Sequence, residues 1–421
     1  MALTLRTNKQ WAQIENSMET SVWLYIIIGF LGLLLPWLKS LENFQLINVP
    51  IVAILLGMVI YLLPLDLPTP DPIEHNGIIL RLSEIAVIIS LMGAGLKLSR
   101  TFSLKAYRVP ILLVVITMLG CIAVTAAIGW WFGLGAASAL LLGAVFAPTD
   151  PVLASEMQVK LEEDEEEEHP VQFNITAEAG INDGMAFPFT WLAIWVAIYG
   201  WDHTEWLQTW LLQDLLYRIV GGLIIGYLFG KAIAWIFFEF PKGVRIAPKL
   251  LGFLAVFITF FVYGIAEAVH AYGFIAVFVA AITIRHFEKT HSFHKEMHNV
   301  IKQVEQLFIT ILLLCLGGYI VTHWFNALTL PMLGMGLIFI FIIRPLFGIV
   351  PTLGTTMPWK QRWAVAFLGI KGVGSFFYLA FALHEVNFPQ KELLWGTVAF
   401  LVVISAVVHR VAGFYVKKKI L

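Results

Sequence analysis

The chain has 421 residues, of which 59% are hydrophobic and 13% are charged, and its mean hydropathy is +0.83. Soluble domains carry roughly a quarter charged residues, so this composition excludes an ordinary soluble protein and predicts a polytopic membrane protein. The net charge of -1 lacks the basic character of a nucleic-acid-binding protein. We therefore expect no nucleic acid partner, and no motif indicates a cofactor.

Apolar runs long enough to cross a membrane follow one another along the chain. A spanning helix needs about 20 mostly apolar residues, and about thirteen runs meet this criterion. In chain order they are 22–39, 47–64, 79–98, 109–133, 136–157, 173–199, 213–238, 249–269, 272–285, 300–322, 329–352, 363–384 and 392–416. The predicted fold is an all-α polytopic membrane protein with one transmembrane domain over 1–421. Spans one to six (22–199) form a first half, 213–238 is a linking span, and 249–416 form the second half.

Lysine and arginine are distributed unevenly between the two sets of loops. They gather in 97–108, 242–249 and the tail 417–419, whereas the loops 64–78 and 200–214 hold acidic residues and no basic ones. The positive-inside rule places the C-terminus in the cytoplasm and, with an odd number of spans, the N-terminus outside. The cytoplasmic loop 160–170 is an exception, because it contains an uninterrupted acidic run. It is either a solvated loop or a patch that attracts cations.

The fifth span is interrupted at Asp150, which lies in the run FAPTDPVLA (146–154). Pro148 and Pro151 lack backbone donors and push the preceding residues toward extended geometry. We therefore predict an unwound segment at 147–151, which at membrane depth must be buried in protein or line a polar cavity. A simple proline kink is the alternative. It leaves the aspartate unexplained, since a charge at a membrane centre costs roughly 3 kcal/mol.

The twelfth span carries a lysine among glycines, in the run GIKGVGS (369–375). Lys371 lies near mid-span, too deep to reach the interface easily. Each half of the chain thus has its fifth span interrupted, which is typical of inverted-repeat transporters with discontinuous helices at the midplane. Half-helix N-termini carry partial positive charge and C-termini partial negative charge. We expect Asp150 to offset facing N-termini and Lys371 to offset facing C-termini.

The sixth span is acidic, with Glu178, Asn182 and Asp183 close together. Glu178 and Asn182 are four residues apart and share a helix face. Arg344, in the middle of the eleventh span, is the natural partner of Glu178, and breaking such a buried pair costs about 3–5 kcal/mol. Asp183 is then left to bind either a proton or a small cation, and this competition is the physical basis of an exchanger. Glu84, in the third span, is a further acidic candidate or an interface residue.

In this order and on these spans, the motifs TDP (149–151), E-x-x-x-N-D-G (178–184), Arg-Pro (344–345) and GIKGVGS resemble those of a known family. The chain is similar to the NhaP-like sodium/proton antiporters of the monovalent cation–proton antiporter superfamily. The resemblance implies the NhaA-like antiporter fold with crossed, interrupted helices, a homodimer in lipid, and a multi-pass protein of the plasma (prokaryotic inner) membrane. It also implies exchange of sodium or lithium for protons by alternating access.

Residue roles carry over from this resemblance by position. Asp183 is the expected ion- and proton-binding carboxylate, and Asp150 and the carbonyl of Thr149 are expected to line the same cation site. Glu84 is expected to contribute from the third span. Asn182, which is also expected to take part in ion binding, stands at the position where electrogenic relatives carry a second aspartate, and this implies electroneutral exchange.

Two positions depart from the pattern of the family. Ala179 replaces a serine whose hydroxyl can bind the ion, so Thr176 or a water molecule is expected to replace it and ion selectivity is open. Lys371 replaces an arginine, which keeps the charge but loses the planar fork.

Three other functions are compatible with parts of the sequence. A potassium/proton antiporter is the near alternative, because ionic radius cannot be read from side-chain identity. An intramembrane aspartyl protease would need two carboxylates that share a proton, but it explains neither the interrupted helices nor Lys371. A passive channel needs a continuous pore with several weak sites, which one deep carboxylate does not suit.

Overall fold

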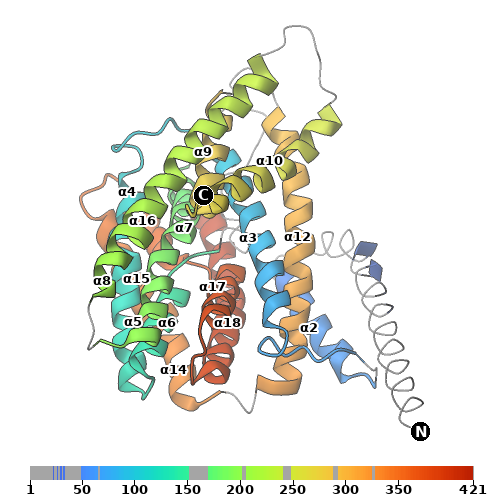
Figure 1. Ribbon diagram of the computed structural model, residues 1–421, viewed down its shortest axis with the longest axis vertical. Coiled ribbons are helices and arrows are strands. Elements are labelled where there is room, and N and C mark those ends of the chain that lie inside the picture. Colours follow the sequence, from blue (N-terminus) through green and yellow to red (C-terminus); the bar gives the residue numbers. More distant parts are fainter. Residues whose placement is uncertain are drawn as a thin grey trace.

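The computed structural model describes residues 49–64, 67–150, 169–201, 205–239, 248–287, 293–324 and 328–420, with isolated positions between 22 and 33. All the regular structure in these ranges is helical (Figure 1). This is expected in lipid, where the backbone must satisfy its hydrogen bonds within each segment. Seven helices in these ranges are long and apolar enough to cross a membrane, and four shorter apolar helices accompany them.

The helices follow the predicted spans closely. They are α2 (Val49–Leu62), α3 (Asn76–Lys97), α4 (Arg108–Leu112), α5 (Leu119–Trp131), α6 (Ala136–Phe146), α7 (Pro170–Tyr199), α8 (Trp206–Thr209), α9 (Arg218–Ala234), α10 (Pro248–Ala268), α11 (Gly273–Phe287), α12 (Phe293–Tyr319), α14 (Leu330–Ile338), α15 (Arg344–Ile349), α16 (Trp359–Phe367), α17 (Val373–Glu385) and α18 (Lys391–Lys419). Short π-helical stretches join α4 to α5, α8 to α9, and α14 to α15.

The boundaries differ from prediction in a few places. The linking span starts at Trp206 rather than at 213, and α12 starts at Phe293 rather than at 300. Both extensions are more polar than the spans they lengthen, so a hydropathy criterion cuts them off. Most of the expected span 22–39, the part of the fifth span beyond Asp150, and nearly all of the acidic loop lie outside the described residues.

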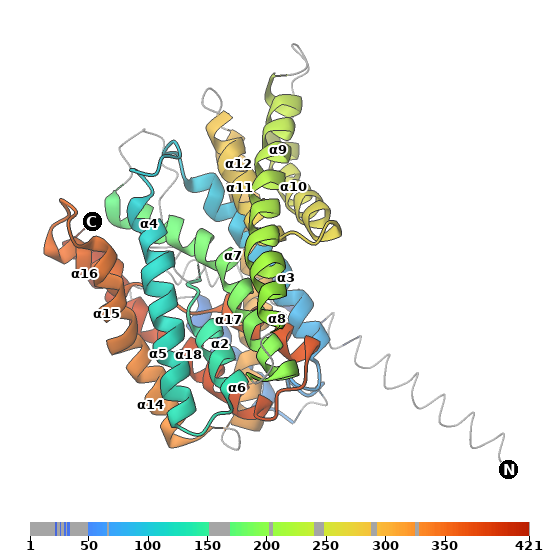
Figure 2. The ribbon, with the colours of Figure 1, turned by 60° about the vertical axis from the view of Figure 1, so that its left-hand side comes forward.

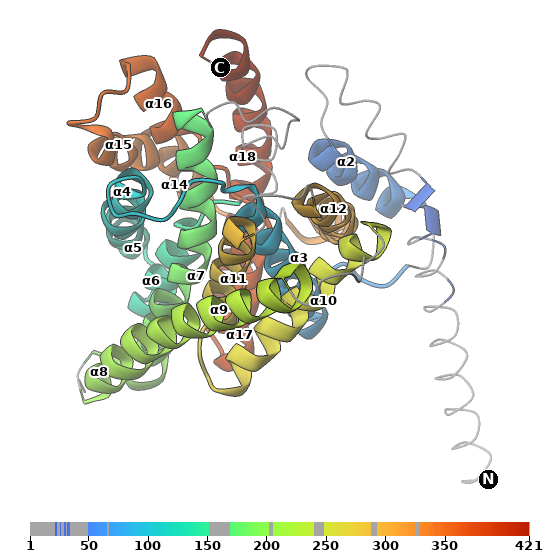
Figure 3. The ribbon, with the colours of Figure 1, turned by 90° about the horizontal axis from the view of Figure 1, so that it is seen from above.

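The helices pack as two bundles that share a boundary. One contains α2, α3 and α9 to α12, and the other contains α4 to α7 and α14 to α18. Figure 3 shows α2 and α12 on one side of the molecule and α4, α5, α15 and α16 on the opposite side. Figure 2 shows α4 and α5 beside α14 and α15, although these segments are far apart in sequence. Each bundle therefore draws helices from both halves of the chain. At the boundary, α17 and α7 of the second bundle contact α3 and α11 of the first.

Small residues bring the helices of the first bundle close together. A Cβ added at Gly226 of α9 would overlap the backbone of Ala276 on α11, and one at Gly57 of α2 would overlap Leu314 on α12. Such contacts are typical of membrane helices, in which van der Waals packing rather than hydrophobic burial drives association. They make the first bundle a tightly packed support for the boundary.

Candidate cation site

The two interrupted helices cross in the second bundle. Helix α6 ends at Phe146, two residues before Pro148, and the gap between α16 and α17 spans 368–372. The two unwound segments are bonded to each other, because the amide N–H of Asp150 donates to the carbonyl of Ile370 at 2.7 Å. The chain is thus non-helical at 147–150 and around Lys371, as predicted for these parts, and the two segments meet at one place.

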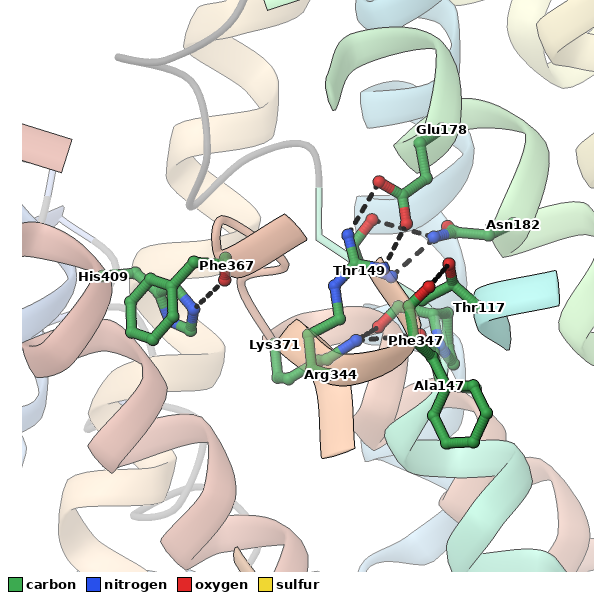
Figure 4. Close-up of polar contacts among 11 residues, drawn as sticks. Thr117, Ala147, Thr149, Glu178, Asn182, Arg344, Phe347, Phe367, Lys371 and His409 are labelled. Atoms are coloured by element: carbon green, nitrogen blue, oxygen red, sulfur yellow. Dashed lines mark hydrogen bonds and ion pairs between the residues drawn. The ribbon is translucent and has the colours of Figure 1, made fainter. Parts of the chain in front are cut away.

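Lys371 closes the end of α6. Its Nζ donates to the carbonyls of Ala147 and Pro148, both at 2.8 Å, and the residue is fully buried (Figure 4). These carbonyls lie just past the C-terminus of α6, where the helix dipole is negative and no intrahelical donor remains. The lysine therefore has the helix-end contact that the sequence predicts for it.

Asp150 compensates the N-terminus of α17, as Lys371 compensates the C-terminus of α6. Its Oδ2 accepts a hydrogen bond from the amide N–H of Val373, the first residue of α17, at 2.5 Å. The residue is 4% exposed. An anion at a helix N-terminus is stabilised by the unpaired amide groups and by the dipole. Each interrupted helix thus carries the charged residue that compensates an end of the other.

Glu178 and Arg344 form the predicted ion pair. Two parallel contacts of 2.8 Å join Nη1 to Oε1 and Nη2 to Oε2, and each side chain is 3% exposed (Figure 4). Bidentate geometry of this kind is the strongest form of an arginine–carboxylate pair. Gly369 makes room for it, since a Cβ there would overlap the arginine side chain. The charge of Glu178 is thereby matched within the protein.

Asn182 and Thr149 hold each other in place. The Asn182 amide donates to the Thr149 hydroxyl at 2.8 Å, and its oxygen accepts from the Thr149 amide N–H at 3.3 Å (Figure 4). Both residues are buried. This pair ties α7 to the unwound segment after α6. Asn182 therefore positions the site, and its expected role as an ion ligand stays a prediction, as does that of the Thr149 carbonyl.

Asp183 is the carboxylate without a match. It is 1% exposed, and its Oδ1 has no hydrogen-bond partner among the described residues. Its backbone carbonyl accepts from the Tyr378 hydroxyl. The carboxylate lies over Gly374, where an added Cβ would come within 3.4 Å of Oδ1. Asp183 therefore faces the first turn of α17, close to the helix end that Asp150 caps.

A cavity of about 10 Å³ joins the two aspartates. Its walls come from α3, α7, α12, α17 and the unwound segment. They are formed by Ala86, Val87, Ser90, Asp150, Asp183, Ile309, Val373 and Gly374. This volume corresponds to about one water-sized probe. No group of three or more His, Cys, Asp or Glu side chains in the described part of the chain is arranged to hold a resident metal.

Glu84 does not line this cavity, contrary to expectation. It pairs with Arg81 at 2.7 Å and accepts from the Tyr263 hydroxyl at 2.5 Å. Its side chain is 15% exposed and lies six residues before Ser90 on α3. The face of α3 that is turned toward the cavity carries Ser90 instead. The packing of α3 against its neighbours, rather than the sequence motif, determines which face this is. Thr176 is also turned to its own helix, because its hydroxyl donates to the carbonyl of Gln172 at 2.9 Å.

A buried pair of opposite charges escaped prediction. Lys97, at the end of α3, and Glu305, on α12, are each 8% exposed and interact electrostatically. From sequence, Lys97 belongs to the basic set of loop residues, and a single glutamate in an amphipathic helix segment has no distinct signature. The only available signal is that Glu305 falls inside a predicted span, where acidic residues are rare.

Two interrupted helices that meet at compensated ends, beside a buried carboxylate, are an arrangement typical of ion-coupled secondary transporters. Comparison with known proteins gives the family. Residues 21–416 match the family described as sodium/hydrogen exchanger, transmembrane. The chain belongs to this family.

Individual relatives agree with this assignment. A Na⁺/H⁺ antiporter of Saccharomyces cerevisiae is 23% identical over 375 residues, which cover 80% of this chain and 37% of the yeast protein. Na⁺/H⁺ antiporter 2 of Zygosaccharomyces rouxii is 29% identical over 189 residues, covering 44% of this chain and 22% of that protein. This chain therefore spans well under half the length of these curated relatives.

The fold has a close counterpart among solved structures. The sodium proton antiporter MjNhaP1 of Methanocaldococcus jannaschii, in a structure at pH 8, superposes with a TM-score of 0.69. The match covers 94% of this chain and 99% of that one at 18% identity. At this identity the likeness establishes the antiporter fold alone, in agreement with the predicted fold class.

Proposed function

We propose that this protein exchanges sodium or lithium for protons, one for one, with Asp183 as the group that binds either ion. The observation that carries the proposal is a buried carboxylate with an unpartnered oxygen, facing a cavity at the crossing of two interrupted helices. Family membership supports the same activity. Because one carboxylate oxygen cannot hold a proton and a cation together, binding of one ion displaces the other.

The charge count at the crossing supports electroneutral exchange. Glu178 is matched by Arg344 through two contacts. Lys371 and Asp150 carry opposite charges and are each bound to the helix end they compensate. Asp183 is then the carboxylate at the crossing whose negative charge the transported ion must balance. One cation or one proton satisfies it, so the loaded site carries the same charge in both cases.

The alternatives are less well supported. A potassium/proton antiporter would use the same carboxylate, and membership of the sodium/hydrogen exchanger family favours sodium. An intramembrane aspartyl protease would need Asp150 and Asp183 to share a proton. The engagement of Asp150 with the α17 amide disfavours that arrangement.

The two-bundle architecture supports alternating access, with the second bundle moving against the first. We also propose a homodimer embedded in the lipid of the plasma (prokaryotic inner) membrane, with the N-terminus outside and the C-terminus in the cytoplasm. These proposals rest on the family resemblance and on the loop charges. The division into inverted repeats over 22–199 and 249–416 rests on the matching positions of the two interruptions.

Proteoliposomes containing the purified chain and a pH-sensitive dye in the lumen test this function. Addition of sodium or lithium outside should alkalinise the lumen, and potassium should do so much less. Clamping the membrane potential at either sign should leave the rate unchanged if exchange is electroneutral. Asp183→Asn supplies the control for leak, and a lumen that does not respond to any alkali cation would refute the proposal.

A further inference from the structure

Ser90 on α3 places an unused hydroxyl in the cavity of Asp150 and Asp183. The residue is 2% exposed and lines that cavity. Its Oγ makes no hydrogen bond of ordinary geometry, and neither does the Asp183 Oδ1 in the same cavity. Buried polar atoms in proteins nearly always have a partner. Both oxygens border the same small cavity, where each is available to a ligand.

Several other buried hydroxyls on these helices bond to their own backbone, although that of Thr125 on α5 does not. Serine and threonine in helices commonly donate to the carbonyl one turn earlier. Ser83, on the same helix, donates to the carbonyl of Ile79 at 2.6 Å. Thr190 and Thr310, on α7 and α12, do the same at 3.1 Å and 2.7 Å. Ser90 has the same backbone option but keeps its oxygen directed away from it.

Position 179 of helix α7 supplies no hydroxyl to this site. Ala179 on α7 is buried and offers no side-chain oxygen, whereas Asp150 and Asp183 supply two carboxylates. Small hard cations prefer several oxygen ligands. Ser90 lines the cavity from α3, the helix of the first bundle that contacts both α17 and α7. A cation that binds a ligand on α3 is therefore held by residues of both bundles, at the boundary between them.

Glu305 lies where it can orient this hydroxyl. It precedes Ile309 of the cavity wall by four residues on α12, so the two share a helix face. Its carboxylate interacts electrostatically with Lys97, with the Ser90 hydroxyl and with Asp150. A hydroxyl that offers a lone pair to a cation must point its hydrogen elsewhere. Glu305 is an acceptor for that hydrogen, and Lys97 offsets its charge.

We propose that Ser90 Oγ is a ligand of the transported cation, in place of a hydroxyl on α7, and that Glu305 is the positioning residue that turns this oxygen toward the cavity. This inference rests on the proposed function, because it refines the same site. It assigns the contribution of α3 to Ser90 rather than to Glu84.

The test compares sodium affinity in variants with and without the hydroxyl. Ser90→Ala should raise the KM for sodium by roughly tenfold, the effect of one lost polar contact, while the maximal rate stays close to that of the wild type. Ser90→Cys, which keeps the volume but replaces oxygen with a soft atom, should behave alike. Ser83→Ala is the matched control, since it removes a buried hydroxyl of α3 outside the cavity and should leave the KM unchanged.

Restoring a hydroxyl from the other side separates ligation from packing. Ala179→Ser in the Ser90→Ala background should recover most of the lost affinity. Glu305→Ala should raise the KM as Ser90→Ala does, Glu305→Gln should preserve affinity because it keeps an acceptor, and the Ser90→Ala/Glu305→Ala double variant should be no worse than either single one.

The outcomes distinguish this inference from the proposed function. If the wild type exchanges sodium for protons and Ser90→Ala and Ser90→Cys retain its KM, the ligand role of Ser90 is overturned. If the wild type itself exchanges no alkali cation, the proposed function fails instead.

Discussion

At the scale of single residues, the charges at the crossing have separate tasks. Asp150 and Asp183 are similar in sequence, since both are aspartates in long apolar stretches. Their surroundings differ, because Asp150 accepts from the α17 amide whereas the Oδ1 of Asp183 has no protein partner in the described residues. The first stabilises the N-terminus of α17, and the second is the proposed binding group for the transported ion.

The Glu178–Arg344 pair allows a test of structural charge. Arg344→Met should destabilise the protein by about 3–5 kcal/mol, because it leaves Glu178 buried and uncompensated. Arg81→Met is the matched control, since Arg81 also pairs with a glutamate at 2.7 Å but is 72% exposed, and such pairs contribute less than about 1 kcal/mol. Replacing Glu178 by Met as well should recover part of the loss. Thermal unfolding in detergent measures this, and equal effects of the two arginine variants would contradict the assignment.

At the scale of elements, the interruptions could be predicted because proline and glycine act locally. Pro148 lies two residues after the end of α6, where it lacks a backbone donor, and Gly372 immediately precedes α17. The Glu178–Arg344 pair could also be predicted, because a charge buried in an apolar span requires an opposite charge close by. The place of Ser90 was not, since one serine in an apolar helix is common and its direction depends on how α3 packs. Glu84 was misplaced for the same reason.

Close helix packing allows a second test at this scale. Gly226→Leu should disrupt the contact of α9 with α11, because even a Cβ at this position would overlap the Ala276 backbone. Gly264→Leu on α10 is the control, since nothing lies within 4 Å of an added Cβ there. We expect a large loss of thermal stability for the first variant and little for the second. Similar melting temperatures would show that the α9–α11 contact does not support the first bundle.

At the scale of the whole molecule, hydropathy and loop charge predict a topology but not the way the helices assemble. The chain order suggests two halves, whereas the packing mixes helices of both halves in each bundle. This mixing brings residues about 200 positions apart, such as Asp150 and Val373, into hydrogen-bond contact. No local sequence pattern encodes such pairings, so the arrangement of the whole site could not be predicted from the sequence.

The orientation in the membrane is testable with single cysteines. In a chain with Cys121 and Cys315 replaced by Ser, Lys418→Cys should be protected from a membrane-impermeant thiol reagent in intact cells, and Glu205→Cys should be labelled. Both positions are exposed to the surroundings of the helices, and the basic tail places Lys418 in the cytoplasm. Labelling in lysed cells is the control for reactivity. The reverse pattern would contradict the predicted orientation.

Competition at Asp183 is the central claim, and the pH dependence of the sodium KM tests it most directly. If one proton and one cation share this carboxylate, lowering the pH should raise the KM for sodium, by up to about tenfold per unit once the proton-bound form dominates. The maximal rate at saturating sodium should change much less, and Asp183→Asn should abolish exchange. A sodium KM that is independent of pH across the active range, or sodium–proton exchange that persists in Asp183→Asn, would contradict the account.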